Sequence, residues 1–342
     1  MKGYRIHAWG GEPVWEDIPD PRPGPEEVLV EVEACGIGLT VLNCIAGNLS
    51  DDPGLLPRVP GHELVGRVVE VGEGVGAGWQ GLRVAAYFYL YCGDCGFCRK
   101  GWQQRCANLA GWVGVHRDGG YAPYAALPSR NVIPLPDGLD PVAATVVPDA
   151  VATPVHVTAR AGIGPDDRVA VIGAGGGVGI HMVQVALSRG AKVAGLDVTE
   201  SKLEAVAEFG ATPVRSNDFA TLQPGIFEGD RPTVVVDFVG TTESTTWAKD
   251  SVETGGRVVA LTTFPGRSVP VSPRELVFRE FSVLGSRYAT TDQLAEAADL
   301  VLSGAVRPVI GRVVEPGEVP SVHEELRAGR LLGRGAIDWR AS

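Results

Sequence analysis

The sequence predicts an α/β protein of two domains, one rich in β-strands and one built on a doubly wound parallel sheet. The chain of 342 residues is long enough for two domains with a sizeable core. Up to about residue 150, short apolar strands are separated by turns. Beyond that point, apolar strands alternate with helical patterns, which is typical of a parallel sheet covered on both faces.

The β-rich domain comprises residues 1–149 and also residues 289–342, because the tail of the chain returns to short strands and loops. A helical pattern at 291–305 begins this tail. Turns rich in Pro, Gly and Asp separate the strands of the first part. Those strand-like segments are EEVLVEVEA (26–34), LVGRVVEVG (64–72) and LRVAAYFYLY (82–91).

Residues 150–288 form the second predicted domain. Its first strand, VAVIGAG (169–175), is a short apolar run, as expected for a strand that is buried on both faces. A helical pattern follows, and then the strand KVAGLDV and the helical pattern ESKLEAVAEFGA. Further buried strands are predicted at 233–240, 257–264 and 281–289.

Composition and charge exclude several classes of function. The net charge of −11 argues against binding to a phosphate backbone, so we expect no nucleic-acid partner. The N-terminus lacks the apolar run of a signal peptide, and the apolar run at 84–91 is too short to cross a bilayer. We therefore expect a cytoplasmic protein with no membrane partner. Disulfides are rare in that compartment, so the cysteines need another explanation.

A glycine-rich stretch, IGAGGGVG (172–179), follows a predicted strand and begins a predicted helix. In this context glycines allow a tight turn and let the backbone approach a pyrophosphate at the helix N-terminus. Two registers fit, one beginning Gly173-x-Gly175 and one reading Ala174-x-Gly176-x-x-Gly179. The second has the complete spacing, so the expected cofactor-binding residues are Ala174, Gly176, Gly177, Val178 and Gly179.

An acidic residue, Asp197, ends the second strand of this domain, about 20 residues beyond the glycines. This is the position of the carboxylate that binds the ribose hydroxyls of an adenine dinucleotide. A carboxylate there repels a 2′-phosphate, so NAD(H) is favoured over NADP(H). The alternative is an ordinary glycine-rich turn followed by an Asp that caps a helix.

Four cysteines lie close together in YCGDCGFCRKGWQQRC, with the spacing Cys92-x2-Cys95-x2-Cys98-x7-Cys106. Four thiolates suit a structural Zn²⁺ with closed tetrahedral coordination, whose role is to order a loop. An iron–sulfur cluster is the rival interpretation, but the bacterial ferredoxin pattern closes with x3 and a Pro, which this chain lacks. Four free buried thiols are the remaining alternative.

Together these features resemble the medium-chain dehydrogenase/reductase family, on its zinc-type alcohol dehydrogenase branch. The resemblance covers nearly the whole chain and rests on GHELVGRVVEVGEGV (61–75), the cysteines, the glycine-rich loop with Asp197, DFVG (237–240) and GSR (285–287). It implies a GroES-like catalytic domain split around a Rossmann domain, with hydride transfer in the cleft between them. It also implies a homodimer or homotetramer, and Lys202, Val239 and Gly240 as further cofactor-binding residues.

The resemblance also implies a catalytic zinc, bound by a Cys, the His of the GHE motif and a third ligand. The His corresponds to His62 and the third ligand to Asp149, and Glu63 is the neighbouring acid that often approaches the metal. The Cys belongs to a turn of the form Gly-x-Cys-x-Thr/Ser-Asp. Here that turn reads GIGLTV (36–41), so Gly38 stands at the ligand position and only Thr40 matches the rest of the turn.

Further departures affect the same site, since Val41 and Asn43 stand where the family has an orienting Asp and a relay His. Three arrangements remain open. His62, Glu63 and Asp149 could hold a second zinc or another metal; Cys35 or Cys44 could move in as a ligand; or the site could be metal-free, with Thr40 and His62 donating to the substrate oxygen. Structural alternatives are a helix-capping role for Asp149 and an N-cap role for Thr40.

The resemblance places Phe88 in the substrate pocket, and Trp112 is a second candidate there. An aromatic lining favours a hydrophobic small-molecule alcohol, aldehyde or ketone over a sugar. The first hypothesis is therefore an NAD(H)-dependent alcohol dehydrogenase or carbonyl reductase. The second is a metal-free enoyl-type reductase, which the missing Cys favours and the four-cysteine lobe disfavours. The third is a dinucleotide-binding protein without catalytic activity.

Overall fold

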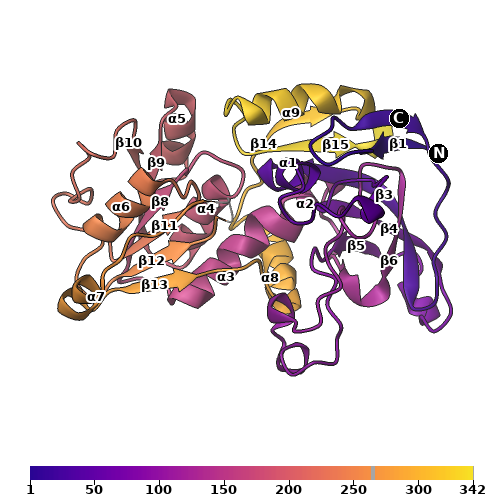
Figure 1. The fold of residues 1–342 in the computed structure, drawn as a ribbon, viewed down its shortest axis with the longest axis horizontal. Coiled ribbons are helices and arrows are strands. Elements are labelled where there is room, and N and C mark those ends of the chain that lie inside the picture. The colour runs from indigo at the N-terminus through magenta and orange to yellow at the C-terminus, as the bar shows by residue number, and fades with distance from the viewer. Residues whose placement is uncertain (263–265, 342) are drawn as a thin grey trace. The chain divides into compact units, whose positions relative to one another are not determined.

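The computed structural model describes residues 1–262 and 266–341 and divides into two compact units (Figure 1). The first unit contains residues 1–152, 289–304 and 310–342, and the second contains residues 153–288 and 305–309. The chain passes from one unit to the other after residues 152, 288, 304 and 309, and the first of these points lies within the helical run that contains Asp149.

A mixed sheet forms the centre of the first unit, with strand order β14-β15-β3-β4-β5-β7 and β6 paired with β3. Strand β3 is the longest strand of this sheet, and its last four residues are all buried. Strands β1 and β2 form a separate antiparallel pair. The strands of this unit are β1 (Lys2–Arg5), β2 (Val14–Asp17), β3 (Glu27–Ile37), β4 (Leu64–Val71), β5 (Arg83–Ala86), β6 (Tyr124–Pro128), β7 (Val132–Pro134), β14 (Ile310–Val314) and β15 (Arg334–Asp338).

Helices cover this sheet and begin at recognisable signals. Helix α2 has Asp140 as its N-cap and a proline in its first turn, and helix α8 begins with a capping box formed by Thr290 and Gln293. Buried Val142 of α2 packs against Ala34 and Ala336 of the sheet. The helices of this unit are α1 (Leu39–Ile45), α2 (Pro141–Ala144), the π-helical turn η6 (Val147–Val151), α8 (Thr291–Leu302) and α9 (Val319–Arg327). Helix α3 (Ala152–Ala161) follows η6 and belongs, from residue 153 onward, to the second unit.

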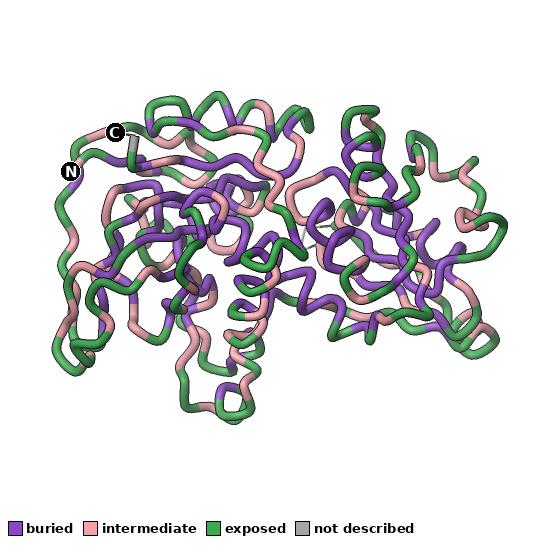
Figure 2. The backbone as a smooth tube through the Cα atoms, turned by 180° about the vertical axis from the view of Figure 1, so that it is seen from behind, coloured by how far each residue is buried: buried purple, intermediate pink, exposed green. Residues whose placement is uncertain are grey.

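A parallel sheet with strand order β10-β9-β8-β11-β12-β13 forms the second unit. This is the doubly wound strand order 3-2-1-4-5-6. All strands are parallel, and the order in which the chain adds them to the sheet changes from one side to the other between β8 and β11. Its central strands are buried (Figure 2), which explains their continuous apolar runs. The elements are β8 (Arg168–Ile172), α4 (Gly179–Ser188), β9 (Lys192–Asp197), α5 (Glu200–Glu208), β10 (Thr212–Arg215), β11 (Val234–Asp237), α6 (Thr242–Ser251), β12 (Arg257–Ala260), α7 (Pro273–Arg279) and β13 (Ser282–Gly285).

Three sequence predictions differ from the structure. The strand predicted at 82–91 is regular only in β5, because the backbone then turns to pair Tyr87 with Asn131 and Leu90 with Gly111. The predicted strand at 257–264 ends at Ala260, and its residues 263 and 264 lie outside the described residues. Strand β10 was not predicted, because it is a short and largely exposed edge strand without an apolar run.

One helical stretch in the described part of the chain, residues 141–161, is long and apolar enough by composition to cross a membrane. Of its most apolar window, 89% is buried inside the protein. This stretch is the run α2–η6–α3, which packs in the core.

Gly66 tests how tightly the central sheet is packed. A Cβ atom at this residue would overlap the carbonyl oxygen of Glu31 on β3, whereas a Cβ at Gly78 would meet nothing within 4 Å. We expect Gly66→Ala to lower the free energy of unfolding by about 1–3 kcal/mol, because the strand pair must separate to admit the methyl group. Denaturant unfolding measures this, with Gly78→Ala as the matched control. Equal stability of the two variants would contradict the packing described for β3 and β4.

Candidate active site

The end of strand β3 sets the geometry of the site. Gly38 follows this strand and is the N-cap of α1, with extended backbone angles. Strand β15 runs antiparallel to β3, pairing Gly335 with Ile37, so one further step of this register places Arg334 opposite Gly38. A Cβ atom at Gly38 would overlap Nη1 of Arg334. The position that lacks the expected cysteine is therefore filled by an arginine side chain.

The His-Glu pair lies directly before β4, beside the end of β3. His62 and Glu63 are buried, and the carbonyl oxygen of Glu63 accepts a hydrogen bond of 3.0 Å from the Gly36 N–H. A Cβ at Gly36 would come within 2.7 Å of Glu63 Oε2, so a glycine at this residue leaves room for the carboxylate.

Asp149 comes from the π-helical turn η6, in the middle of the helical run. Such turns project one side chain out of the regular helical register and are frequent at functional sites. The alternative that Asp149 caps a helix is wrong, because it lies inside the helical run. The structure brings one ligand atom each of His62, Glu63 and Asp149 within 4.8 Å of one another.

Arg334 completes this group, and the sequence analysis missed it. Its Nη2 donates to Glu63 Oε1 at 2.6 Å and to Asp149 Oδ2 at 2.8 Å. The side chain is 3% exposed, so the two ion pairs are shielded from water. The sequence contains only a weak signal for Arg334. It is a single Arg near the C-terminus, and no motif of fixed spacing connects it to the GHE motif.

Burial and charge act in opposite directions on this group. Burial raises the pKa of Glu63, while the Arg334 guanidinium and His62 oppose the rise. Burial lowers the pKa of Arg334, but the two carboxylates outweigh it, and the net shift is upward. The guanidinium is therefore a permanent positive charge between two acids.

Several polar atoms of this group have no hydrogen-bond partner within the described part of the chain, namely His62 Nε2, Glu63 Oε2 and Arg334 Nε. His62 Nε2 lies 3.6 Å from Asp149 Oδ2, beyond the usual range for a hydrogen bond. Unpartnered buried polar atoms are costly, and at functional sites they are the atoms left over for a ligand. His62 Nε2 is thus a buried nitrogen to which the described part of the chain offers no hydrogen-bond partner.

Neither additional cysteine joins the group of ligand atoms. Burial raises the pKa of Cys44 to about 12, and burial also raises the pKa of Cys35 well above its usual value. The Cys35 Sγ is directed towards the carbonyl oxygen of Gly36, at 3.7 Å. Both thiols are thus neutral core groups, as their burial indicates.

Thr40 lies in the first turn of α1 and is half-buried. The prediction that Thr40 could be an N-cap is wrong, since Gly38 has that position. Val41 of the same helix is buried, and the Asn43 Oδ1 accepts a long hydrogen bond of 3.4 Å from Asn48.

The two expected pocket aromatics differ in their relation to His62. The Phe88 ring lies against the His62 ring, with centroids 4.2 Å apart. The Tyr89 ring contacts the rings of both Phe88 and Trp112. Phe88 is thus an immediate neighbour of the site, and Trp112 belongs to the aromatic cluster behind it.

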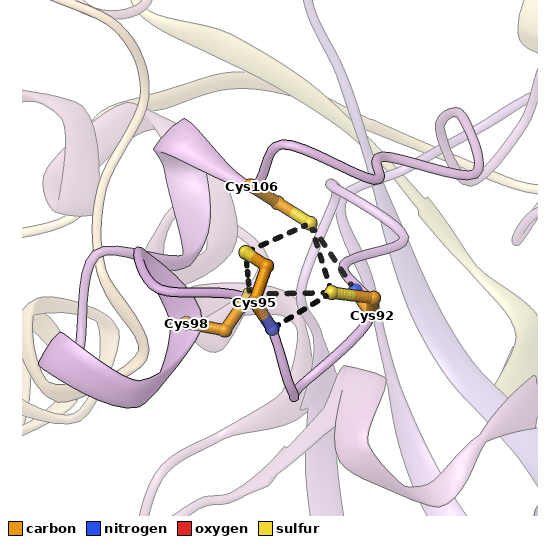
Figure 3. A group of neighbouring side chains, drawn as sticks. All are labelled: Cys92, Cys95, Cys98 and Cys106. Atoms are coloured by element: carbon orange, nitrogen blue, oxygen red, sulfur yellow. Dashed lines mark hydrogen bonds between the residues drawn. The ribbon is translucent and has the colours of Figure 1, made fainter.

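The four-cysteine lobe has the geometry of a metal site (Figure 3). The Sγ–Sγ distances are 3.9 Å for Cys92–Cys98, 3.5 Å for Cys95–Cys98, 4.0 Å for Cys95–Cys106 and 3.5 Å for Cys92–Cys106. A tetrahedron with Zn–S bonds of about 2.3 Å has edges of about 3.8 Å. The side chains converge on one point, so these residues fit a structural Zn²⁺.

The glycine-rich loop joins β8 to α4 in the second unit. Gly173 has a positive φ of 77°, which permits the tight turn after the strand. A Cβ at Gly179 would overlap the Gly173 carbonyl oxygen, so the first residue of α4 must be a glycine for the helix to begin this close to the strand. The loop lies at the carboxyl end of β8, next to the switch point of the sheet, where open α/β sheets bind ligands.

Asp197 closes the same loop from the end of β9. Its Oδ2 accepts the Gly175 N–H at 2.9 Å, and its Oδ1 accepts the Val198 N–H at 2.8 Å. This carboxylate is buried and fixed by backbone groups. Asp197 is not the N-cap of α5, because Thr199 has that position.

The remaining expected cofactor residues surround this loop. Lys202 lies on α5 and is buried. A Cβ atom at Gly175 would overlap its side chain. Val239 and Gly240 follow β11, and both N–H groups donate to Asp237 Oδ1, at 2.8 and 2.9 Å. A Cβ at Gly173 would lie 3.1 Å from Val239 Cγ2, so the turns after β8 and β11 are neighbours across the switch point.

Two protein families match this chain. Residues 24–137 match the family described as "Alcohol dehydrogenase GroES-like domain", and residues 177–303 match the one described as "Zinc-binding dehydrogenase". These segments fall in the first unit and mostly in the second unit respectively.

Curated relatives and solved structures cover almost the whole chain. An alcohol dehydrogenase of Geobacillus stearothermophilus is 33% identical over 93% of both chains, and an acryloyl-coenzyme A reductase of Metallosphaera sedula is 28% identical over 93% of this chain and 94% of its own. The structure of acetophenone reductase from Geotrichum candidum in complex with NAD is similar, with a TM-score of 0.87 and 30% identity over 98% of this chain and 96% of its own.

Removing one thiol tests the cysteine lobe. We expect Cys98→Ser to lose about one equivalent of zinc per chain and to lower the melting temperature, because the metal orders a loop that has little core of its own. Inductively coupled plasma mass spectrometry measures the zinc. The control is Cys35→Ala, which removes a buried thiol outside the lobe and should keep the zinc. Unchanged zinc in Cys98→Ser would refute the assignment.

Proposed function

Because this chain belongs to the zinc-type alcohol dehydrogenase branch of the medium-chain dehydrogenase/reductase family, we propose that it transfers hydride between NAD(H) and a hydrophobic small-molecule alcohol, aldehyde or ketone. The second unit binds the dinucleotide. The first unit provides the groups that bind the substrate oxygen, and its four-cysteine lobe holds a structural zinc.

The observation that carries this proposal is the turn between β8 and α4, closed by Asp197. The glycines of the loop and of the first residue of α4 carry no side chain, so a pyrophosphate can approach the backbone closely at the start of the helix. Asp197 is fixed by the loop itself, so a carboxylate faces the place where the adenosine ribose binds. A 2′-phosphate would meet this negative charge, which favours NAD(H). The related acetophenone reductase, whose structure contains NAD, supports the same cofactor.

The groups available for the substrate oxygen are the Thr40 hydroxyl and His62 Nε2. Both donate or share a proton with an oxygen that gains negative charge during hydride transfer. Phe88 covers the His62 ring and provides an apolar wall, which favours a hydrophobic substrate. Asn43 has no titratable nitrogen, so the proton leaves by another route than an imidazole relay.

A reductase that acts on an activated carbon–carbon double bond is the second candidate. The absence of a thiol beside His62 favours it, and so does the resemblance to acryloyl-coenzyme A reductases, at 28% identity. Such a reaction places negative charge on a carbonyl oxygen conjugated to the double bond, and the same donors would stabilise it.

A substrate screen separates these candidates. NADH oxidation is followed with hydrophobic aldehydes, ketones and enoyl thioesters, and NAD⁺ reduction with the corresponding alcohols. Carbonyl products without alkene reduction support the first candidate, and saturated thioesters support the second. Binding of NADH without turnover of any of these classes would favour a non-catalytic dinucleotide-binding protein.

The protein is expected to assemble into a homodimer or homotetramer. Strand β13 is at the edge of the parallel sheet, and it exposes Val283. Helix α7, which precedes it, exposes Val277 and Phe278, each at 69%. An edge strand beside exposed apolar side chains is suited to pairing with a second copy.

Cofactor preference depends on Asp197. We expect Asp197→Ala to raise the KM for NADH about tenfold, since a fixed acceptor for the ribose hydroxyls is lost, and to narrow the preference for NADH over NADPH. Steady-state kinetics with both cofactors measure this. Asp166→Ala, which removes an exposed carboxylate on the same unit, is the control. A preference that does not change would contradict the role given to Asp197.

Thr40 tests the donor to the substrate oxygen. We expect Thr40→Ala to lower kcat/KM by about 10²-fold, because one donor to the developing negative charge is lost. Thr40→Ser keeps the hydroxyl and should keep most of the activity. Equal loss in both variants would show that the methyl group, and not the hydroxyl, is what the site requires.

A further inference from the structure

The group formed by His62, Glu63 and Asp149 already holds a cation, the guanidinium of Arg334. We propose that Arg334 permanently takes the place of the catalytic metal in this chain, so that the active site binds no metal ion. This goes beyond the proposed reaction, since it concerns what occupies the site, and only its catalytic consequence rests on the proposed function.

The first argument is the use of the ligand atoms. A metal held by this group needs an oxygen from each carboxylate and the nitrogen of His62. Arg334 Nη2 donates to Asp149 Oδ2 at 2.8 Å and to Glu63 Oε1 at 2.6 Å, and Asp149 Oδ2 is also the oxygen nearest to His62 Nε2, at 3.6 Å. The arginine thus binds one oxygen of each carboxylate, including the Asp149 oxygen that lies 3.6 Å from His62 Nε2.

The second argument is steric. Arg334 begins β15 opposite the end of β3, and its Nη1 lies where a Cβ of residue 38 would be. A cysteine at 38 and Arg334 in this conformation exclude each other. The glycine at position 38 and the arginine among the remaining ligands are therefore sterically linked, since Gly38 leaves the space that the guanidinium fills.

The third argument is charge. Glu63 and Asp149 supply two negative charges, and Arg334 supplies one positive charge at hydrogen-bond distance. A divalent cation added to this group would lie next to a buried guanidinium that cannot deprotonate. Without a thiolate, two of the three remaining donors are hard carboxylates, which select less strongly for zinc than thiolates do. Residues in this arrangement do not fit a catalytic Zn²⁺.

The consequence for the reaction follows from the contacts of Arg334. Its two hydrogen bonds hold the Glu63 and Asp149 carboxylates, and its contact to Asp149 leaves His62 Nε2 without a hydrogen-bond partner in the described chain. Arg334 is then a positioning residue. Polarisation of the substrate oxygen rests on neutral donors, Thr40 and His62, in place of a Lewis acid.

Metal stoichiometry tests the proposal without any assay of turnover. The full-length protein, purified from zinc-supplemented cells, is expected to contain about one zinc per chain, held by the four cysteines. Titration of this zinc-loaded protein with Co²⁺ should produce no visible absorption from a second site. Two zinc ions per chain, or a bound Co²⁺ in the wild type, would overturn the proposal.

Variants of Arg334 test the cause. Arg334→Met removes the charge at similar length and frees both carboxylates, so Co²⁺ should now bind and absorb in the visible range. Arg334→Lys keeps a positive charge and should bind none. Arg340→Met removes an exposed arginine just beyond the other end of β15 and should behave as the wild type. If Arg334→Met does not fold, the double variant Arg334→Ala with Gly38→Cys restores the ligand set, and its thiolate-to-cobalt absorption replaces that measurement.

Chelation distinguishes this proposal from the proposed function. A chelator that leaves the cysteine lobe loaded should leave the wild-type activity unchanged, whichever substrate class the screen identifies. Loss of activity that added zinc restores would overturn the role of Arg334 and leave the hydride-transfer proposal intact. Absence of turnover together with one zinc per chain would overturn only the proposed reaction.

Discussion

The ion pairs of Arg334 with Glu63 and Asp149 hold the first unit together at its functional centre. They join β15 to the start of β4 and to the π-helical turn η6, three segments that are far apart in the sequence. Because all three side chains are buried, loss of one partner would leave an uncompensated charge, at a cost of about 3–5 kcal/mol. The positions of His62 and of the helix start at Gly38 both depend on this arrangement.

The chain carries two clusters of metal-ligand residues, and their chemistry differs. In the cysteine lobe, four soft thiols converge at distances that match one tetrahedron. In the active site, hard oxygens surround a guanidinium that the fold itself provides. Selection for zinc is therefore strong at the first cluster and weak at the second. We therefore expect zinc at the cysteine lobe and not at the reaction centre.

The dinucleotide half of the protein follows its sequence closely. Glycines are needed where a Cβ would overlap a backbone atom, as at Gly179, and this requirement is local and visible in the motif. Asp197 also has a fixed sequence distance to the loop, because one strand and one helix separate them. The catalytic half is less predictable, since its residues come from four separate segments whose spacing is not constrained by a motif.

The sequence by itself determined the two-domain α/β architecture, the nucleotide loop, the cysteine lobe and the absence of a thiol at position 38. These features depend on residue type and local spacing, which set backbone conformation and metal chemistry. Only the tertiary structure decided what fills the place of that thiol. The antiparallel register of β3 and β15 brings Arg334 opposite Gly38, although nearly the whole chain separates them. Such a pairing depends on long-range strand register, which no local pattern around either residue contains.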